Sequence, residues 1–374
     1  MTTPLPHHDA GLPRDSVSGR PAVAERGLHL DAARMYFPGE WIHALLERMA
    51  DLRLNAFQWH FSENEGVRLA SSAFPEIVSA EHIDRSEARE IIAHARDLGI
   101  DVVPSLDMPG HLRHALATRP ELQLPSRGGI DTSHALDITN PAAVDFARRL
   151  IDDYADVFRD STYWNLGGDE FVDFVRMDDY PTLAAEAERR FGPGATGFDL
   201  LTDFVNEIAE YLIQRGFTPR AWNDGLFRSS LVRLDPRVEI TWWTNYHRDM
   251  RPAEEAFAAG HRVLNFDDRH WYYVVGQNAG YWHPTSERAW ADDWHPGVFS
   301  PLAGVTAQEW RQPYPDLLAG AYFSIWSDKG GESLEEITRR IQLPLAAFAE
   351  RCWNGGSSLT FEQFIALATS PRHR

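Results

Sequence analysis

Short apolar runs alternate with amphipathic segments along almost the whole chain, and this alternation limits the possible folds more than any other feature. The runs are rich in β-branched and aromatic residues, as strands buried on both faces of a parallel sheet are. They cover residues 27–33, 55–62, 101–108, 163–170, 218–225, 238–244, 261–267 and 320–328. Eight strands that alternate with helices predict an α/β fold, a single (β/α)8 TIM barrel.

The segments between the runs carry helix signals. We expect helices over residues 39–52, 86–98, 141–158, 198–215 and 333–353. Ser86 stands at a position typical of an N-cap, and Gly99 at one typical of a C-cap. Asn140 followed by Pro141 is likewise a pattern with which helices begin.

The chain of 374 residues is expected to form one domain, because barrels of this size are common as single units. Residues 1–24 are polar and rich in proline, which predicts a flexible N-terminal tail. Residues 25–374 are predicted to form the catalytic barrel, with a long loop insertion at about 268–318. Loops of that length within a compact domain are usually functional.

Charge and composition narrow the choice of partners. The formal net charge of −19 gives a surface that repels DNA and anionic membranes, so we expect neither as a partner. The chain has no apolar run long enough to span a membrane and no signal-peptide core, which fits a cytoplasmic protein or a mature secreted form. Cys352, the single cysteine, is expected to be an apolar filler. A monomer is compatible with these features, and the sequence leaves the oligomeric state open.

Polar and aromatic residues gather where the predicted strands end, which is where the active sites of such barrels lie. They are Asp31, Arg34, His60, Glu63, Asp107, His111, Asp169, Glu170, Trp222, Asp224, Trp242, Trp243, Asp267, Trp326 and Asp328. Tryptophan faces stack on the apolar faces of pyranose rings, and carboxylates and arginine bind hydroxyls. The set therefore predicts a sugar-binding site.

The segment Gly167-Gly168-Asp169-Glu170 is the sharpest single motif. Adjacent residues of a regular strand point to opposite faces, but two glycines permit a bulge that turns both carboxylates into one pocket. Like charges so close together, beside an aromatic wall, raise the pKa of at least one carboxyl. A carboxylic acid that stays protonated near neutral pH is what a general acid needs. Taken alone, the motif also fits a structural turn or a metal site.

Nine segments in order extend the pattern over about residues 27–350. They read GLHLDAARMYFP, NAFQWHFSENEG, VVPSLDMPGH, LDITN, WNLGGDEF, RAWNDGL, VEITWW, VLNF and AGAYFSIWSD. With these segments the chain resembles glycoside hydrolase family 20, the β-N-acetylhexosaminidases. Within that family it is most similar to the single-domain dispersin type, which cleaves the biofilm polysaccharide β-1,6-linked poly-N-acetylglucosamine.

The resemblance implies a mechanism. Glu170 takes the role of the general acid/base, and Asp169 orients the 2-acetamido group of the substrate. The acetamido oxygen attacks the anomeric carbon and forms an oxazolinium-like intermediate, so that configuration is retained. Such an enzyme needs neither a nucleophile of its own nor a metal or cofactor, and its partner is an oligosaccharide or polysaccharide that contains N-acetylglucosamine.

The resemblance also assigns substrate-binding positions. They are Arg34, His111, Trp222, Asp224, Trp243, Tyr272, Trp326 and Asp328. Arg34 would bind hydroxyls of the non-reducing sugar with its guanidinium fork. The three tryptophans would enclose the acetamido methyl and the ring face, and His111 would tune a carboxylate of the catalytic pair.

The chain departs from the family pattern at three places. The acetamido-binding tyrosine of the family lies in a Y-x-D-like segment, whereas this chain reads Tyr272-Tyr273-Val274, which favours Tyr272 and leaves Tyr273 open. Asp328 stands where the family often has the longer glutamate. Asp173 replaces a tyrosine of the dispersin type, which leaves the linkage preference open and raises the hypothesis of a partly deacetylated substrate.

Other functions remain to be compared. An exo-β-N-acetylhexosaminidase that acts on β-1,4 chitooligosaccharides or glycan-derived residues is the alternative within the family. A glycan-binding barrel without activity would keep the tryptophans and lose the acid, but this chain has both Asp169 and Glu170. A metal-dependent hydrolase would place His-x-His at the end of the first strand, where this chain reads His29-Leu30-Asp31.

Overall fold

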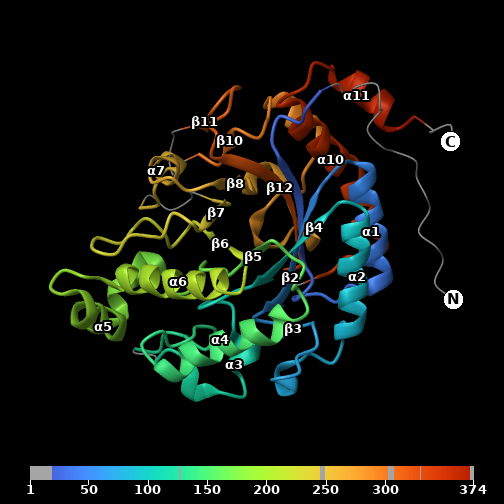
Figure 1. The fold of residues 1–374 in the computed structure, drawn as a ribbon. Helices are drawn as coiled ribbons and strands as arrows, with labels where there is room; N and C mark the ends of the chain where they lie inside the picture. The colour runs from blue at the N-terminus through green and yellow to red at the C-terminus, as the bar shows by residue number, and fades with distance from the viewer. Residues whose placement is uncertain (1–18, 126–127, 245–248, 302–306, 329, 371–374) are drawn as a thin grey trace.

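The computed structural model describes residues 19–125, 128–244, 249–301, 307–328 and 330–370. The predicted (β/α)8 barrel is confirmed. Eight parallel strands follow the order β1-β12-β8-β7-β6-β5-β4-β2, and a further pairing of β2 with β1 closes the ring. The strands occupy the centre of the molecule and the helices surround them (Figure 1).

Each predicted run overlaps one barrel strand. The strands are β1 (Glu25–Asp31), β2 (Ala56–Glu63), β4 (Asp101–Leu106), β5 (Tyr163–Asn165), β6 (Thr218–Trp222), β7 (Glu239–Trp242), β8 (Val263–Asn265) and β12 (Leu318–Trp326). The extension of β5 to Glu170 was wrong, because Gly167 and Gly168 adopt φ values of +85° and +97° that end the extended backbone. Asp169 and Glu170 therefore lie on a turn beyond the strand.

The predicted helices are also present. They are α1 (Gly39–Asp51), α2 (Arg85–Asp97), α4 (Pro141–Ala155), α6 (Gly197–Ile213) and α10 (Leu334–Asn354). The side chain of Asn140 accepts a hydrogen bond from the Ala142 amide at the start of α4, as its cap position predicts. Ser86 was wrong as an N-cap: α2 begins one residue earlier, so the extended Asp84 occupies the cap position.

Residues 268–318 are less irregular than expected. They contain α8 (Asp268–Trp271), β9 (Tyr272–Val274), the 3-10 helix η5 (Val275–Gly280), α9 (Ser286–Ala291), β10 (Val298–Phe299) and β11 (Gln308–Glu309). Strand β9 pairs in parallel with the end of β12, so that Tyr272 lies opposite Ser324 and the insertion is tied to the barrel. The predicted tail lies mostly outside the described residues, which begin at residue 19.

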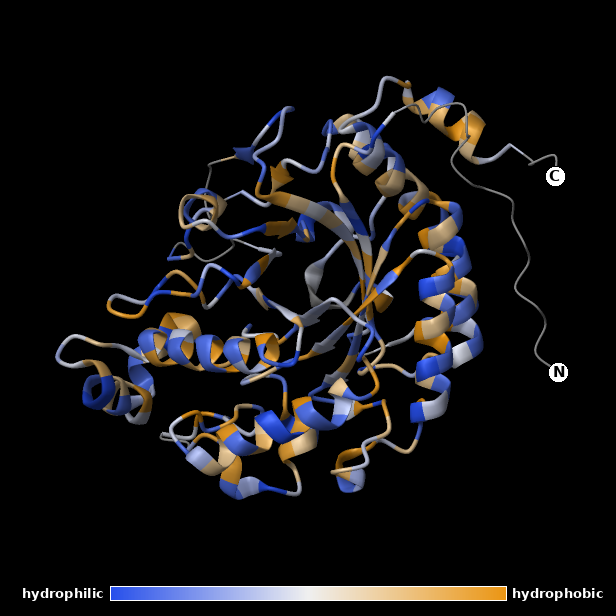
Figure 2. Ribbon diagram, in the orientation of Figure 1, coloured by the Kyte–Doolittle hydropathy of each residue, from blue (hydrophilic) through white to orange (hydrophobic). Residues whose placement is uncertain are grey.

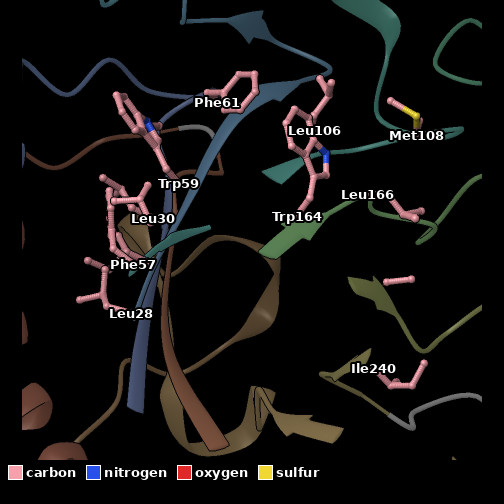
Figure 3. Packing of buried hydrophobic residues seen from close by; sticks show 14 of the residues in the cluster. Leu28, Leu30, Phe57, Trp59, Phe61, Leu106, Met108, Trp164, Leu166 and Ile240 are labelled. Atoms are coloured by element: carbon pink, nitrogen blue, oxygen red, sulfur yellow. The ribbon is translucent and has the colours of Figure 1, made fainter. Parts of the chain in front are cut away.

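Side chains alternate along the barrel strands. Leu28 and Leu30 of β1 project from the same side as Phe57 and Trp59 of β2 (Figure 3) and belong to the main hydrophobic core. His29, between the two leucines, faces the barrel interior and is fully buried. The strands and the helix faces toward them are largely hydrophobic, whereas the outer helix faces are hydrophilic (Figure 2). Among the described helices, none has both the length and the apolar character that crossing a bilayer requires.

Buried ion pairs lie at the end of the barrel where the strands begin. Arg220 of β6, with 0% exposure, donates to both carboxylate oxygens of Glu25 at 2.8 and 2.7 Å. Its Nε donates to Glu239 at 2.9 Å. Arg220 and Glu25 thus compensate each other's charge away from water, and Glu239 is shared between Arg220 and the half-exposed Arg262, 2.7 Å away.

We expect Arg220→Met to lower the free energy of unfolding by about 3–5 kcal/mol, since it leaves the buried carboxylate of Glu25 without a cation and Glu239 with Arg262 alone. Urea unfolding followed by circular dichroism measures this loss. Arg237→Met is the matched control, because Arg237 is 54% exposed in its pairs with Asp235 and Glu210. The control should lose much less, because exposed ion pairs contribute little, and equal losses in the two variants would contradict the assigned role of the buried pair.

Candidate active site

A cavity of about 420 Å³ opens at the C-terminal ends of the barrel strands. It is lined by Arg34, Glu63, His111, Asp169, Glu170, Trp222, Trp243, Tyr272, Val274, Tyr281, Trp326 and Asp328. The structure thus brings together all the predicted site residues on one cavity surface, with the exception of Asp224. The volume lies within the range of about 300–1,000 Å³ that small-molecule sites occupy.

The turn after β5 brings both catalytic-pair carboxylates into the cavity. A side chain at Gly167 would place its Cβ 2.7 Å from the Cα of Asp107, so glycine is what lets this turn pack on the end of β4. Glu170 itself adopts a φ of +40°, a conformation that is uncommon for residues with a side chain and that often marks functional sites. The expected bulge within the strand is therefore a turn, and it has the expected effect.

Asp224 supports the catalytic turn from behind the cavity wall. Its Oδ2 accepts a hydrogen bond from the Glu170 amide at 3.0 Å, and its Oδ1 accepts one from Trp243 Nε1 at 3.1 Å. Burial raises the pKa of Asp224, and the negative charge of Asp169 raises it further. The sequence predicted Asp224 as a substrate-binding residue. In the structure Asp224 is buried, and its two hydrogen bonds connect the Glu170 backbone to the Trp243 indole.

His111 connects the carboxylates of the cavity. Its Nδ1 lies 2.7 Å from Glu63 Oε1, and its Nε2 lies 3.3 Å from Asp169 Oδ2 and 3.7 Å from Glu170 Oε2. Burial alone would lower the pKa of His111, but the facing charges of Glu63 and Asp169 outweigh it and raise the pKa well above its usual value. The two facing carboxylates therefore favour the charged form of the His111 imidazole.

Glu170 differs from the other carboxylates in its environment. Partial burial raises its pKa, the His111 cation opposes that rise, and the charge of Asp169 adds to it. Its side chain is 50% exposed, so the carboxyl is accessible from solvent. A carboxyl with a raised pKa that solvent and ligand can reach is suited to donate a proton and take one back.

Arg34 forms the polar end of the cavity. Its guanidinium lies 3.0 Å from Asp31, 2.7 Å from Glu63 and 3.6 Å from Asp328, and 5.5 Å from the ring centroid of Trp326. Burial opposes its charge, but the surrounding carboxylates hold the pKa of Arg34 well above its usual value. The arginine is therefore fixed in orientation with its planar fork beside an aromatic face.

Aromatic rings form the remaining walls. Trp243 and Tyr272 are parallel, with an interplanar angle of 2° and centroids 6.1 Å apart, and Tyr272 lies 5.8 Å from Trp326. Tyr273 is directed elsewhere and donates its hydroxyl hydrogen bond to Glu332. Of the two tyrosines, Tyr272 is thus the one that faces the cavity.

Several buried polar atoms of the cavity wall lack a complete set of hydrogen bonds within the described part of the chain. Among them are Asp169 Oδ1, which is an acceptor, and the Tyr272 hydroxyl, whose proton has no acceptor. Buried groups of this kind are costly unless a ligand or water satisfies them. Their presence marks the place where the cavity is complementary to a polar group of its ligand.

Three cavity residues were not among the predicted site residues. Glu63 was recognised at a strand end, and its pairing with His111 and Arg34 became visible only in the structure. Val274 and Tyr281 come from the insertion, where no periodic pattern marks the side chains that face inward.

Two overlapping groups among the described residues have the spacing that a metal ion would accept, His60–Glu63–Asp107 and Asp107–His111–Asp169. In both, the ion pairs of His111 already compensate carboxylate charge.

Residues 24–356 match the profile described as glycosyl hydrolase family 20, catalytic domain. The chain belongs to this family. Lacto-N-biosidase of Bifidobacterium bifidum is 30% identical over 92% of this chain, which covers 29% of that protein. Beta-hexosaminidase 1 of Arabidopsis thaliana is 25% identical over 95% of this chain and 60% of its own length. The family-20 chain thus spans less than two thirds of these relatives.

Solved structures share the fold. A beta-N-acetylhexosaminidase from Bacteroides fragilis superposes with a TM-score of 0.74 at 24% identity, covering 93% of this chain and 69% of that one. Dispersin B superposes with a TM-score of 0.67 at 22% identity, covering 89% of this chain and 99% of that one. At these identities the superpositions establish the barrel fold.

Gly110 allows the loop that carries His111 to lie against the catalytic turn. A Cβ at Gly110 would meet the Asp169 carbonyl oxygen at 2.7 Å and Phe171 Cα at 3.0 Å. We expect Gly110→Ala to displace the turn and lower hydrolysis of a chromogenic glycoside by about a hundredfold, since a shift of about 1 Å has that effect on catalytic geometry. Gly216→Ala, where nothing lies within 4 Å, should cost stability through its φ of +90° and leave turnover unchanged. Equal turnover in both variants would refute this role of Gly110.

Proposed function

We propose that the chain is a retaining β-N-acetylglucosaminidase in which the acetamido group of the substrate acts as the nucleophile. The observation that carries this proposal is the pair of unsatisfied atoms, Asp169 Oδ1 and the Tyr272 hydroxyl, in the cavity wall. A secondary amide has one N–H donor and one carbonyl acceptor, and such a pair satisfies both. Asp169 would then orient the amide through its N–H, and Tyr272 would donate to its oxygen.

Glu170 supplies the proton in the first step. The carboxylic acid protonates the glycosidic oxygen as the bond from that oxygen to the anomeric carbon breaks, and the acetamido oxygen forms a bond to the same carbon. In the second step a water molecule attacks that carbon and gives its proton to the Glu170 carboxylate, and the ring formed by the amide opens. Both displacements invert the anomeric carbon, so the net result is retention.

The other cavity residues fit a sugar in this orientation. Arg34 and Asp328, 3.6 Å apart, offer a donor and an acceptor to the hydroxyls of the non-reducing sugar. Trp222, Trp243 and Trp326 supply apolar faces against which the ring and the acetamido methyl can pack.

For the natural substrate we propose β-1,6-linked poly-N-acetylglucosamine. Support comes from the nine ordered segments that resemble the dispersin type and from the coverage of 99% of Dispersin B by a barrel of the same fold. Asp173, the position that left the linkage open, has a role within the protein, because its carboxylate accepts a hydrogen bond from the Val175 amide at 3.1 Å.

A second candidate is the release of a disaccharide unit. The relative with 30% identity over 347 residues is named for lacto-N-biose, and this is the observation that favours the candidate. Asp328 is one methylene shorter than the glutamate common in the family, and its carboxylate lies 3.6 Å from Arg34. Exo-cleavage of β-1,4 chitooligosaccharides is the remaining alternative within the family.

The direct test is hydrolysis of p-nitrophenyl β-N-acetylglucosaminide, together with β-1,6 oligomers, β-1,4 oligomers and the corresponding lacto-N-bioside. We expect Glu170→Gln to lower kcat for the oligomers by about 10²–10⁴, because it removes the proton donor. Glu47→Gln, whose side chain is 60% exposed in a pair with His94, should not change turnover. Faster cleavage of the β-1,4 oligomer or of the lacto-N-bioside would overturn the β-1,6 proposal, and inactivity of the wild type on every substrate would overturn the enzyme assignment.

The pH dependence tests the raised pKa of Glu170. Activity requires the protonated acid, so it is retained below this pKa and lost as pH rises through it, which forms the basic limb of the kcat/KM profile. The charge of Asp169 raises the pKa of Glu170, so Asp169→Asn should move the basic limb to lower pH in the residual activity. A basic limb that stays in place or moves to higher pH in this variant would contradict the assigned coupling.

A further inference from the structure

His29 is a buried histidine inside the barrel that the proposed reaction does not use. It lies on β1 with 0% exposure. Its register neighbours on the two adjacent strands are Gln58 of β2 and Ser324 of β12, which are also fully buried. Neither nitrogen of the His29 ring forms a hydrogen bond within the described part of the chain. Because a buried polar group without a partner costs stability, hydrogen bonding within the protein does not account for a histidine at this position.

The ring of His29 contacts four other rings inside the barrel. Their centroids lie 4.2 Å (Trp326), 5.4 Å (His60), 6.0 Å (Trp222) and 6.4 Å (Phe266) from its own. Trp222 and Trp326 also contact each other, with centroids 6.1 Å apart. Since β6, which carries Trp222, lies across the barrel from β1, this imidazole joins aromatic rings from opposite sides of the barrel interior.

Two of the four rings line the cavity. Trp222 and Trp326 belong to its wall, whereas His29 has no exposed surface. Ser324, the register partner of His29, precedes Trp326 by two residues and points to the same face of β12. His29 therefore lies one layer deeper in the barrel than Trp326, and it supports from below the two indoles that a sugar would contact from above.

The environment of His29 favours an uncharged ring. Burial lowers the pKa of His29 well below its usual value, the charges of His60 and Arg34 lower it further, and the charge of Glu63 opposes this fall. A neutral imidazole packs among aromatic rings as a flat surface. A cation at this depth would oppose the positive charge that develops on the sugar during glycoside cleavage.

We propose that His29 is a positioning residue, which holds the indoles of Trp326 and Trp222 in the orientation that fits the sugar. It acts through these two rings and does not touch the substrate. The role deepens the proposed function and rests on it, since the ligand that the two tryptophans contact is the N-acetylglucosamine unit of that proposal. A flat ring fixes the tilt of its neighbours, whereas an aliphatic chain of similar volume would fill the space without fixing them.

Two variants separate the ring of His29 from its nitrogens. His29→Phe keeps a flat ring, whereas His29→Gln keeps hydrogen-bonding groups in a layer that already holds Gln58 and Ser324. We expect His29→Gln to raise the calorimetric Kd of N-acetylglucosamine by about tenfold and His29→Phe to raise it by less than about threefold. The KM for p-nitrophenyl β-N-acetylglucosaminide should rise with the Kd while kcat stays within about twofold, because binding is weakened and the carboxyls that carry the reaction are unchanged.

A double-mutant cycle tests the path through Trp326. In the Trp326→Leu background the ring contact is already lost, so His29→Gln should lower kcat/KM by only about twofold. The matched control is Leu28→Ala on the same strand, which removes a fully buried side chain from the outer core. It should lower the unfolding midpoint and leave the Kd and KM unchanged.

The outcomes distinguish the role of His29 from the proposed function. The positioning role is refuted if N-acetylglucosamine binds the wild type and His29→Gln leaves its Kd unchanged, or if His29→Phe weakens binding as much as His29→Gln. Equal losses of kcat/KM in the two Trp326 backgrounds would refute it too, as would a fall in kcat at unchanged KM, which reports a loss of folded protein. In each of these cases the proposed function stands. A wild type that neither binds N-acetylglucosamine nor cleaves the aryl glycoside would overturn both.

Discussion

The arrangement of the site depends on the contacts of His111 with two carboxylates. His111 lies between Glu63 on one side and Asp169 on the other, and Arg34 also faces Glu63. Without these cations the cavity would gather buried negative charges that repel one another and could not stay ionised. Because His111 contacts Asp169 through Oδ2 only, Oδ1 of that carboxylate stays available for a ligand. The charges of His111 and Asp169 also act on Glu170: the first lowers its pKa and the second raises it.

The barrel makes this arrangement possible by bringing distant segments to one end. The catalytic turn follows β5, its support Asp224 follows β6, and Trp326 ends β12. Asp224 joins the Glu170 amide to the Trp243 indole, so the acid and the aromatic wall keep a fixed spacing. The Arg220 ion pairs lie at the opposite end of the barrel. That end contributes to stability, and the end with the cavity carries the site.

The sequence predicts the features that depend on local pattern and misses those that depend on what covers a side chain. Apolar runs located every barrel strand, and the paired glycines located the turn that carries Asp169 and Glu170. Tyr272 and Tyr273 differ by one residue of register, and the sequence does not contain the pairing of β9 with β12 in which Tyr272 faces the cavity. The sequence could not predict that Asp224 is buried beneath the Trp243 indole, to which it is hydrogen-bonded. No periodic pattern predicted that Tyr281 lines the cavity.

The claim on which the rest of the account depends is that the substrate's acetamido oxygen is the nucleophile held by Asp169 and Tyr272. The measurement that tests it most directly is kcat/KM for aryl β-glucosaminides whose N-acyl group is acetyl, fluoroacetyl, difluoroacetyl or trifluoroacetyl. Fluorine withdraws electron density from the amide oxygen without much change in size. A steep fall in rate with each fluorine is the predicted result, because the nucleophile weakens at every step. A flat series, with all four substrates hydrolysed at similar rates, would contradict the account and would assign the attack to a group of the protein or to water.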